Sequence, residues 1–262
     1  MQSASFDNYA HLYDAHFTFS PVGLLQRQMV YTHLLPLLNK EKNVLELNCG
    51  TGHDAFEMAK HVKTIFAIDA SSKMIAISNA KKVENKIENI TFELKHTEAL
   101  NEEIKKANFI FSNFGGLNCL SPHEFKLFAF KCKSLLTTNS DLFFVIMGRK
   151  CIWERVYFFI KFKFRKAFRR KQKKGVSTII YETAFKTWYY SPQEIQDFFG
   201  AAFKTEIIAG IGFFVPPSYL NPFFANKRIL LKLFNRLDKI FCKFRWTANY
   251  ADHYVIHLKK LS

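Results

Sequence analysis

A short segment near residue 50 constrains the fold of this chain more than any other feature. Residues 44–52 read Val-Leu-Glu-Leu-Asn-Cys-Gly-Thr-Gly, a strand that runs into a glycine turn, and a helix begins directly afterwards. Gly50 and Gly52 let the backbone turn tightly and approach a ligand, and the helix start presents free N–H groups. A second predicted strand ends at Asp69, whose carboxylate can accept hydrogen bonds from both hydroxyls of a ribose. The pattern predicts a nucleoside-binding α/β domain.

Strands and helices alternate after this segment, which predicts a parallel sheet with helices on both faces. The predicted strands are 43–47, 64–69, 90–94, 109–113, 141–147, 205–211 and 253–259. The predicted helices are 5–18, 22–38, 53–62, 72–83 and 122–136.

We expect a single domain because the last predicted strand returns to the sheet. Its parts are a helical cap (1–42), a core (43–148), a basic and aromatic insertion (149–190), and a C-terminal part of the sheet (191–262) with a second insertion (213–250). Within the first insertion, two short strands are expected at 176–181 and 184–190.

The glycine turn also satisfies a dinucleotide fingerprint, Gly50-x-Gly52-x-x-Ala55 with Asp69 downstream. Glu46 argues against that interpretation, because a carboxylate suits a cationic ligand better than a pyrophosphate. The helices that precede the first strand argue against an NAD-dependent enzyme as well.

The string E-L-N-C-G-T-G-H-D-A at 46–55 resembles the first motif of class I S-adenosylmethionine (SAM)-dependent methyltransferases, with Asn48 where the family most often has glycine. The string F-D-N-Y-A-H-L-Y-D at 6–14 is similar to a pattern common in that family, and S-N-F-G-G-L-N-C at 112–119 resembles a bacterial small-molecule subgroup. The resemblance covers about residues 5–148. It implies a Rossmann-like, doubly wound, seven-stranded sheet with an antiparallel last strand, SAM as cofactor, S-adenosylhomocysteine (SAH) as product, and no metal.

The resemblance also implies where SAM and its acceptor bind. The implied cofactor-binding residues are Tyr13, Glu46, Asn48, Gly50, Gly52, Asp69, Ala70, Met74, His96, Thr97, Ser112, Asn113 and Phe114. The candidate substrate-binding residues are Tyr9, Asn118, Arg149, Trp153 and Tyr219.

Methyl transfer needs a general base only when the acceptor loses a proton. The candidate bases are His123, His253 and Tyr219, and the sequence does not rank them. Arg27 and Arg149 are the cations expected near the site.

We expect a small, aromatic or lipophilic acceptor. The N-P-P-Y and D-P-P-Y motifs, which would signal methylation of an amino nitrogen on a base or glutamine, are absent. Two alternatives remain open. One is a nucleic-acid methyltransferase that docks through the basic insertion, and the other is a non-catalytic lipid-binding protein with a SAM-type fold.

The positive charge of the chain is concentrated in one segment. The net charge is +16, and residues 150–174 hold eleven Lys or Arg against one acid, Glu154. Trp153, Tyr157, Ile160, Phe164 and Phe168 recur at helical spacing there, which predicts one amphipathic helix. The segment can be a solvated face, a contact with an anionic membrane, or a nucleic-acid contact; the interleaved aromatic residues favour the membrane over RNA.

The five cysteines form no C-x-x-C pair, which indicates reduced thiols. The sequence shows no signal peptide and no apolar run of membrane-spanning length. We therefore expect a cytoplasmic protein that can touch a membrane surface.

Overall fold

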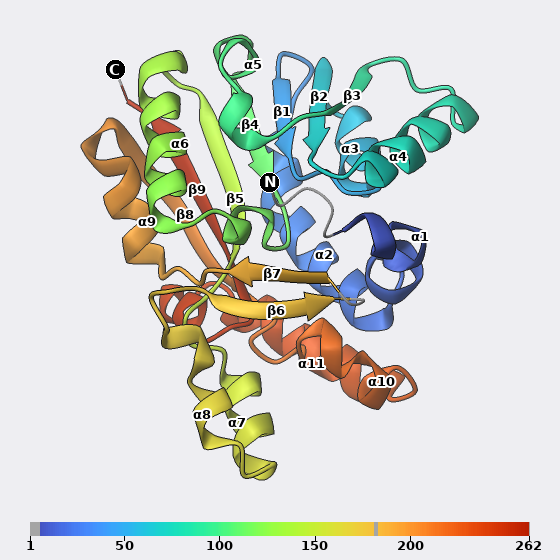
Figure 1. The fold of residues 1–262 in the computed structure, drawn as a ribbon, viewed down its shortest axis with the longest axis vertical. Helices are drawn as coiled ribbons and strands as arrows, with labels where there is room; N and C mark the ends of the chain where they lie inside the picture. The colour runs from blue at the N-terminus through green and yellow to red at the C-terminus, as the bar shows by residue number, and fades with distance from the viewer. Residues whose placement is uncertain (1–5, 181–182, 262) are drawn as a thin grey trace.

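A seven-stranded sheet organises the protein in this computed structural model, which describes residues 6–180 and 183–261. The strand order is β3-β2-β1-β4-β5-β9-β8 (Figure 1). β9 runs antiparallel to both of its neighbours, β5 and β8, and the remaining pairs are parallel. The strands are β1 (Asn43–Leu47), β2 (Thr64–Asp69), β3 (Ile90–Leu94), β4 (Phe109–Ser112), β5 (Asp141–Met147), β8 (Phe203–Ile211) and β9 (His253–Lys260). The fold class expected from the sequence is confirmed.

Helices cover both faces of the sheet because alternate residues of each buried strand point to opposite sides. Leu45, Ile110 and Phe144 pack on one face, with helices α5, α6 and α9, and Val44, Phe109 and Phe143 pack on the other, with α2, α3 and α4. The helix bounds are α2 (Pro21–Leu34), α3 (His53–Ala59), α4 (Ser72–Glu84), α5 (Glu102–Lys106), α6 (Pro122–Leu135) and α9 (Pro192–Phe199). Three of them begin with a serine cap followed by proline: Ser20-Pro21, Ser121-Pro122 and Ser191-Pro192.

The first part of the predicted helical cap, residues 7–18, lies beside the carboxyl ends of β1 and β2 (Figure 1) and is called the cap from here on. It consists of a 3₁₀ turn (Asp7–Tyr9), α1 (Ala10–Tyr13) and a π-helical turn (Asp14–Thr18). Ser5, with which the predicted helix began, lies outside the described residues.

The insertion after β5 forms two short helices and a hairpin rather than the single long helix that the sequence predicted. α7 (Ile152–Ile160) ends in a turn where Phe162 has a positive φ of 53°, and α8 (Phe164–Ala167) follows. The positive φ of Phe162 ends the helix, because every residue of a right-handed helix has a negative φ. β6 (Val176–Ile180) and β7 (Thr183–Thr187) then pair antiparallel; Tyr181, the expected end of the first of these strands, lies outside the described residues.

The second insertion holds α10 (Asn221–Phe224) and α11 (Arg228–Phe241). Trp153 of α7 packs edge-on against Phe224 and Phe234, with ring centroids 5.6 and 5.8 Å apart. The two insertions are therefore neighbours, and Figure 1 shows α7 and α8 projecting from the body of the protein below the β6–β7 hairpin. No helix in residues 6–180 and 183–261 is long and apolar enough to cross a membrane.

Candidate cofactor and acceptor site

The glycine turn after β1 has the backbone that the sequence predicted. Gly50 and Gly52 have φ values of 55° and 81°, and Asn48 has 56°. A Cβ added to Gly52 would lie 2.8 Å from the ring of Phe92, so a side chain does not fit there. Asn48 stands where related motifs have glycine, and asparagine adopts the left-handed region more readily than most residues.

Asp69 lies at the carboxyl end of β2, directly beside this turn. Its two carboxylate oxygens accept hydrogen bonds from the backbone nitrogens of Gly50 (2.9 Å) and Ser71 (2.8 Å). Burial raises the pKa of Asp69, and these hydrogen bonds oppose that rise. The Asp69 carboxylate therefore holds the glycine turn in place. It also lies where the sequence predicts a residue that binds the ribose.

We expect Asp69→Ala to weaken SAM binding by about 1.5–3 kcal/mol, the range for hydrogen bonds to a charged group. Calorimetric titration with SAM measures this loss, and a melting curve checks that the variant is folded. Glu93→Ala removes an exposed carboxylate from the adjacent strand β3 and serves as the control. Unchanged SAM affinity in folded Asp69→Ala would show that the carboxylate only holds the loop.

A buried ion pair between Arg27 and Asp54 lies beside the glycine turn. Asp54, in the first turn of α3, accepts hydrogen bonds from Arg27 Nε (2.9 Å), the Tyr31 hydroxyl (2.6 Å) and Asn113 Nδ2 (3.0 Å). Burial raises the pKa of Asp54, but the Arg27 guanidinium and the hydrogen bonds from Tyr31 and Asn113 together outweigh it and hold that pKa below its usual value. The sequence analysis missed Asp54; an acid in the first helical turn after a glycine loop was the available signal.

Several buried polar atoms near the turn have no hydrogen-bond partner among the described residues. They include Glu46 Oε2, Asn48 Oδ1 and Arg27 Nη1. Burial, together with the nearby Asp54 carboxylate, raises the pKa of Glu46 well above its ordinary value. Oxygen acceptors of this kind suit an ammonium group, and a free guanidinium N–H suits a carboxylate. The set therefore fits the amino-acid end of SAM.

The N-terminal cap covers the glycine turn. A Cβ on Gly50 would lie 3.6 Å from the ring of Tyr13, and Tyr9 packs on Tyr13 with ring centroids 5.9 Å apart. Asp14 accepts a hydrogen bond from Thr51 Oγ1 (2.7 Å) and pairs with Lys81 of α4. The cap is thus attached to both elements that border the expected cofactor position.

Aromatic rings meet at the carboxyl end of β4. Phe114 packs edge-on against Phe17 of the cap (5.1 Å) and against His253 (5.5 Å), the first residue of β9. The Nδ1 atom of His253 lies 3.2 Å from the Asp252 carboxylate, and Asp252 pairs with Arg170 at 2.7 Å. Burial raises the pKa of Asp252, but its interactions with His253 and Arg170 together outweigh this and keep that pKa low. The sequence did not reveal this chain of contacts, because its members are far apart in the chain.

Other predicted cofactor residues lie along the same edge of the sheet. Ala70 follows β2, and Met74 is buried on α4. Thr97 and Ser112 are buried, whereas His96 is exposed. Contact of these residues with SAM stays a prediction.

Several candidate substrate residues have other partners. Asn118 is fully buried, donates to the carbonyls of Met147 and Trp188, and accepts from Met147 N, so its amide holds β5 and the chain after β7 together. Arg149 pairs with Glu194, and the Trp153 indole donates to Phe214 O (3.1 Å). Tyr219 packs on Tyr157 of the insertion. Their surroundings do not support acceptor roles for Asn118, Arg149 and Trp153.

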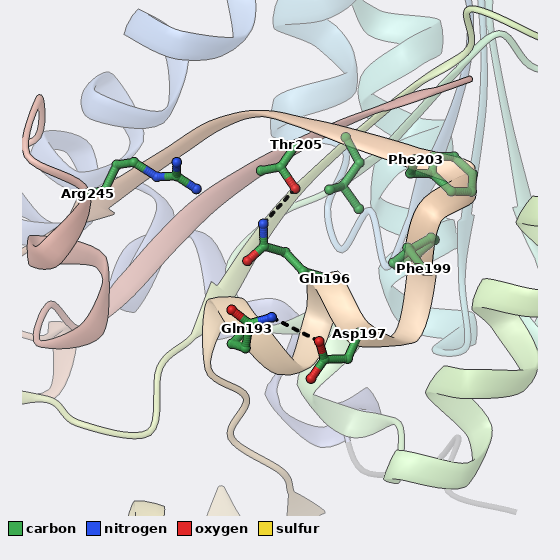
Figure 2. A pocket seen from close by; sticks show the side chains of 9 residues that line it. Gln193, Gln196, Asp197, Phe199, Phe203, Thr205 and Arg245 are labelled. Atoms are coloured by element: carbon green, nitrogen blue, oxygen red, sulfur yellow. Dashed lines mark hydrogen bonds between the residues drawn. The ribbon is translucent and has the colours of Figure 1, made fainter. Parts of the chain in front are cut away.

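The structure has a small hollow at the glycine turn and a larger groove away from it. A small one is lined by Tyr13, Arg27, Asn48, Asp54, Asn113 and Phe114, among others, and so belongs to the glycine turn. A groove of about 680 Å³ lies between α9 and the amino half of β8 (Figure 2). In this groove Gln196 bonds to Thr205 and Gln193 bonds to Asp197. Ligands of open α/β sheets bind at the carboxyl ends of the strands, so the small hollow lies where the cofactor is expected to bind.

The fold and the glycine turn define a Rossmann-like enzyme of the nucleoside-binding class. A family model described as a methyltransferase domain matches residues 38–187, and the chain belongs to this family. It is a SAM-dependent methyltransferase, as the resemblance implied. No curated protein matches the chain in sequence.

Solved structures share the fold at low sequence identity. A structure described as a DhpI–SAM–HEP complex has 14% identity and a TM-score of 0.61, covering 97% of this chain and 94% of its own. A SAM-dependent methyltransferase from Methanosarcina mazei has 16% identity and a TM-score of 0.59, covering 88% and 96%. A putative SAM-dependent methyltransferase from Listeria monocytogenes has 13% identity and a TM-score of 0.59, covering 91% and 99%.

Proposed function

We propose that this enzyme methylates a small, aromatic or lipophilic acceptor that binds beside Phe114. The observation that carries the proposal is the group of aromatic rings at the carboxyl end of the sheet. Phe17 and His253 flank Phe114, and Phe6, directly before the cap, meets Phe185 of β7 with ring centroids 5.3 Å apart. Apolar walls with few polar groups are typical of sites for small apolar ligands.

SAM supplies an activated methyl group, so the protein has mainly to align the acceptor with it. The glycine turn and Asp69 hold the nucleoside end, and the free groups of Glu46, Asn48 and Arg27 hold the amino-acid end. With SAM held in this way, these residues would leave its methyl group to face the acceptor on the side of Phe114.

We further propose that His253 accepts the proton of an acceptor O–H or N–H as the new bond to carbon forms. Its Nδ1 faces Asp252, which leaves Nε2 for the acceptor. Of the other candidates, His123 is exposed on α6 and Tyr219 packs on the insertion. The position of His253 against Phe114 favours it over both.

The protein is expected to bind SAM and SAH and to show no binding of NAD, because Glu46 and the glycine turn suit a sulfonium amino acid better than a pyrophosphate. Calorimetric titration with the three compounds tests the cofactor. Transfer of labelled methyl groups from SAM to panels of phenols, lipophilic acids and RNA tests the acceptor. Tighter binding of NAD than of SAM would contradict the cofactor assignment, and transfer to RNA alone would overturn the acceptor proposal.

A further inference from the structure

The turn between α7 and α8 exposes an unusual run of side chains. All eight residues from 159 to 166, Phe-Ile-Lys-Phe-Lys-Phe-Arg-Lys, are exposed. Ile160 and Phe162 expose 73% and 82% of their surface. Phe159 packs edge-on with Phe164 (5.4 Å) and Phe168 (5.7 Å), so the rings gather into one cluster at the tip.

Other side chains of α7 already attach the insertion to the protein, so the tip is not needed for packing. Trp153 packs on α10 and α11, and Tyr157 packs on Tyr219. Glu154 is buried and binds Arg169 and Arg170. Arg170 is therefore buried and Arg169 is partly covered. Eight of the other nine basic residues of 150–174, all except Arg155, are exposed and available to a partner.

The neighbouring helix α11 has the same character. Leu231 and Asp238 face inward, and the Asp238 carboxylate accepts hydrogen bonds from three backbone N–H groups of 213–215. Ile229, Leu233 and Ile240 are spaced at helical intervals and are exposed, Ile229 by 87%. Lys232, Arg236 and Lys239 lie between them in sequence.

We propose that this docking surface, formed by residues 156–168 and the exposed side of α11, binds the protein to an anionic membrane. Exposed apolar side chains flanked by Lys and Arg match the two parts of such a surface, the acyl boundary and the negative headgroups. A second copy of the chain is a poor partner, because both copies carry a net charge of +16. RNA would pair with the cations and stack on the rings but would leave the aliphatic side chains exposed.

Sedimentation with vesicles tests the proposal in the absence of SAM and acceptor, so the result does not depend on the proposed function. Wild type is expected to sediment with vesicles that contain phosphatidylglycerol at low salt, less at high salt, and weakly with pure phosphatidylcholine. Two variants divide the surface: Ile160→Ser with Phe162→Ser, and Lys161, Lys163, Arg165 and Lys166 all changed to Gln. Each is expected to weaken binding about tenfold or more, through lost apolar burial and lost attraction to the headgroups.

Matched controls remove similar groups elsewhere. Val83→Ser with Phe130→Ser removes exposed apolar side chains of α4 and α6, and Lys86, Lys105, Lys106 and Lys204 changed to Gln removes four exposed charges. Both controls are expected to bind like wild type. Failure of wild type to bind vesicles, or equal losses in tip variants and controls, would overturn the proposal. So would tighter binding of poly(U) RNA than of vesicles at the same salt, with no effect of the Ile160 and Phe162 changes.

Discussion

Replacing Glu154 with alanine is expected to lower the free energy of unfolding by about 3–5 kcal/mol, a large part of the stability of an ordinary domain. Glu154 is 1% exposed, and its two oxygens bind Arg169 (2.8 Å) and Arg170 (3.1 Å). Removal of the carboxylate leaves the Arg170 guanidinium buried with only Asp252 to balance it, while Arg169 loses its partner. Urea unfolding followed by circular dichroism measures the change.

Glu206→Ala is the matched control for this experiment. Glu206 also pairs with a cation, Lys204 at 3.1 Å, but both side chains are partly exposed. Surface pairs of this kind contribute about 0–1 kcal/mol. Equal effects of the two substitutions would contradict the view that the Glu154 cluster holds the insertion to the sheet.

Replacing His253 with glutamine is expected to lower kcat by about 10²–10⁴-fold, the usual contribution of a positioned general base. The affinity for SAH should be unchanged, because His253 contacts Phe114 and Asp252 and makes no hydrogen bond to the glycine turn, Asp69 or the Arg27–Asp54 pair among the described residues. The assay is methyl transfer to the best acceptor of the panel, beside calorimetric titration with SAH.

His123→Gln provides the control, since His123 is exposed on α6. Asp252→Asn tests the positioning residue and should also lower kcat, because the carboxylate that orients the imidazole is lost. Full activity of His253→Gln would refute the assignment. A parallel loss of SAH affinity would show that the residue shapes the cofactor site and does not act as a base.

Local sequence patterns were sufficient to place the core strands along the chain, whereas the seven-stranded sheet with its antiparallel last strand was predicted from the family resemblance. The strand 141–147 is apolar after its first residue and bounded by turn residues, and the structure has β5 at those positions. The glycine turn could also be predicted from the sequence, because its backbone requires residues that adopt positive φ values. Asp69 was predicted at the end of the second strand, and it lies beside Gly50 because the neighbouring parallel strands end at one edge of the sheet.

Tertiary contacts account for what the sequence did not show. In the sequence, Arg169 and Arg170 cannot be distinguished from the exposed Lys and Arg residues around them. Only the folded chain brings Arg170 to Asp252, which is 82 positions away. Asn118 looked free to meet an acceptor, but backbone groups from two other segments occupy its amide. Trp153 belongs to the regular series of apolar residues in the insertion. That series does not show that Trp153 packs on α10 and α11, which follow much later in the chain.

The position of the cap has a consequence for the timing of each catalytic cycle. Tyr13 lies over Gly50, Asp14 is bound to Thr51 and Lys81, and Asp7 bonds to Ser71 and the Lys73 backbone at the start of α4. SAH bound at the proposed site would lie under this cover and would leave only when the cap detaches, so its release would depend on breaking these polar contacts. Ionic strength weakens such contacts, and the residence time of SAH on the enzyme should therefore shorten as salt is added.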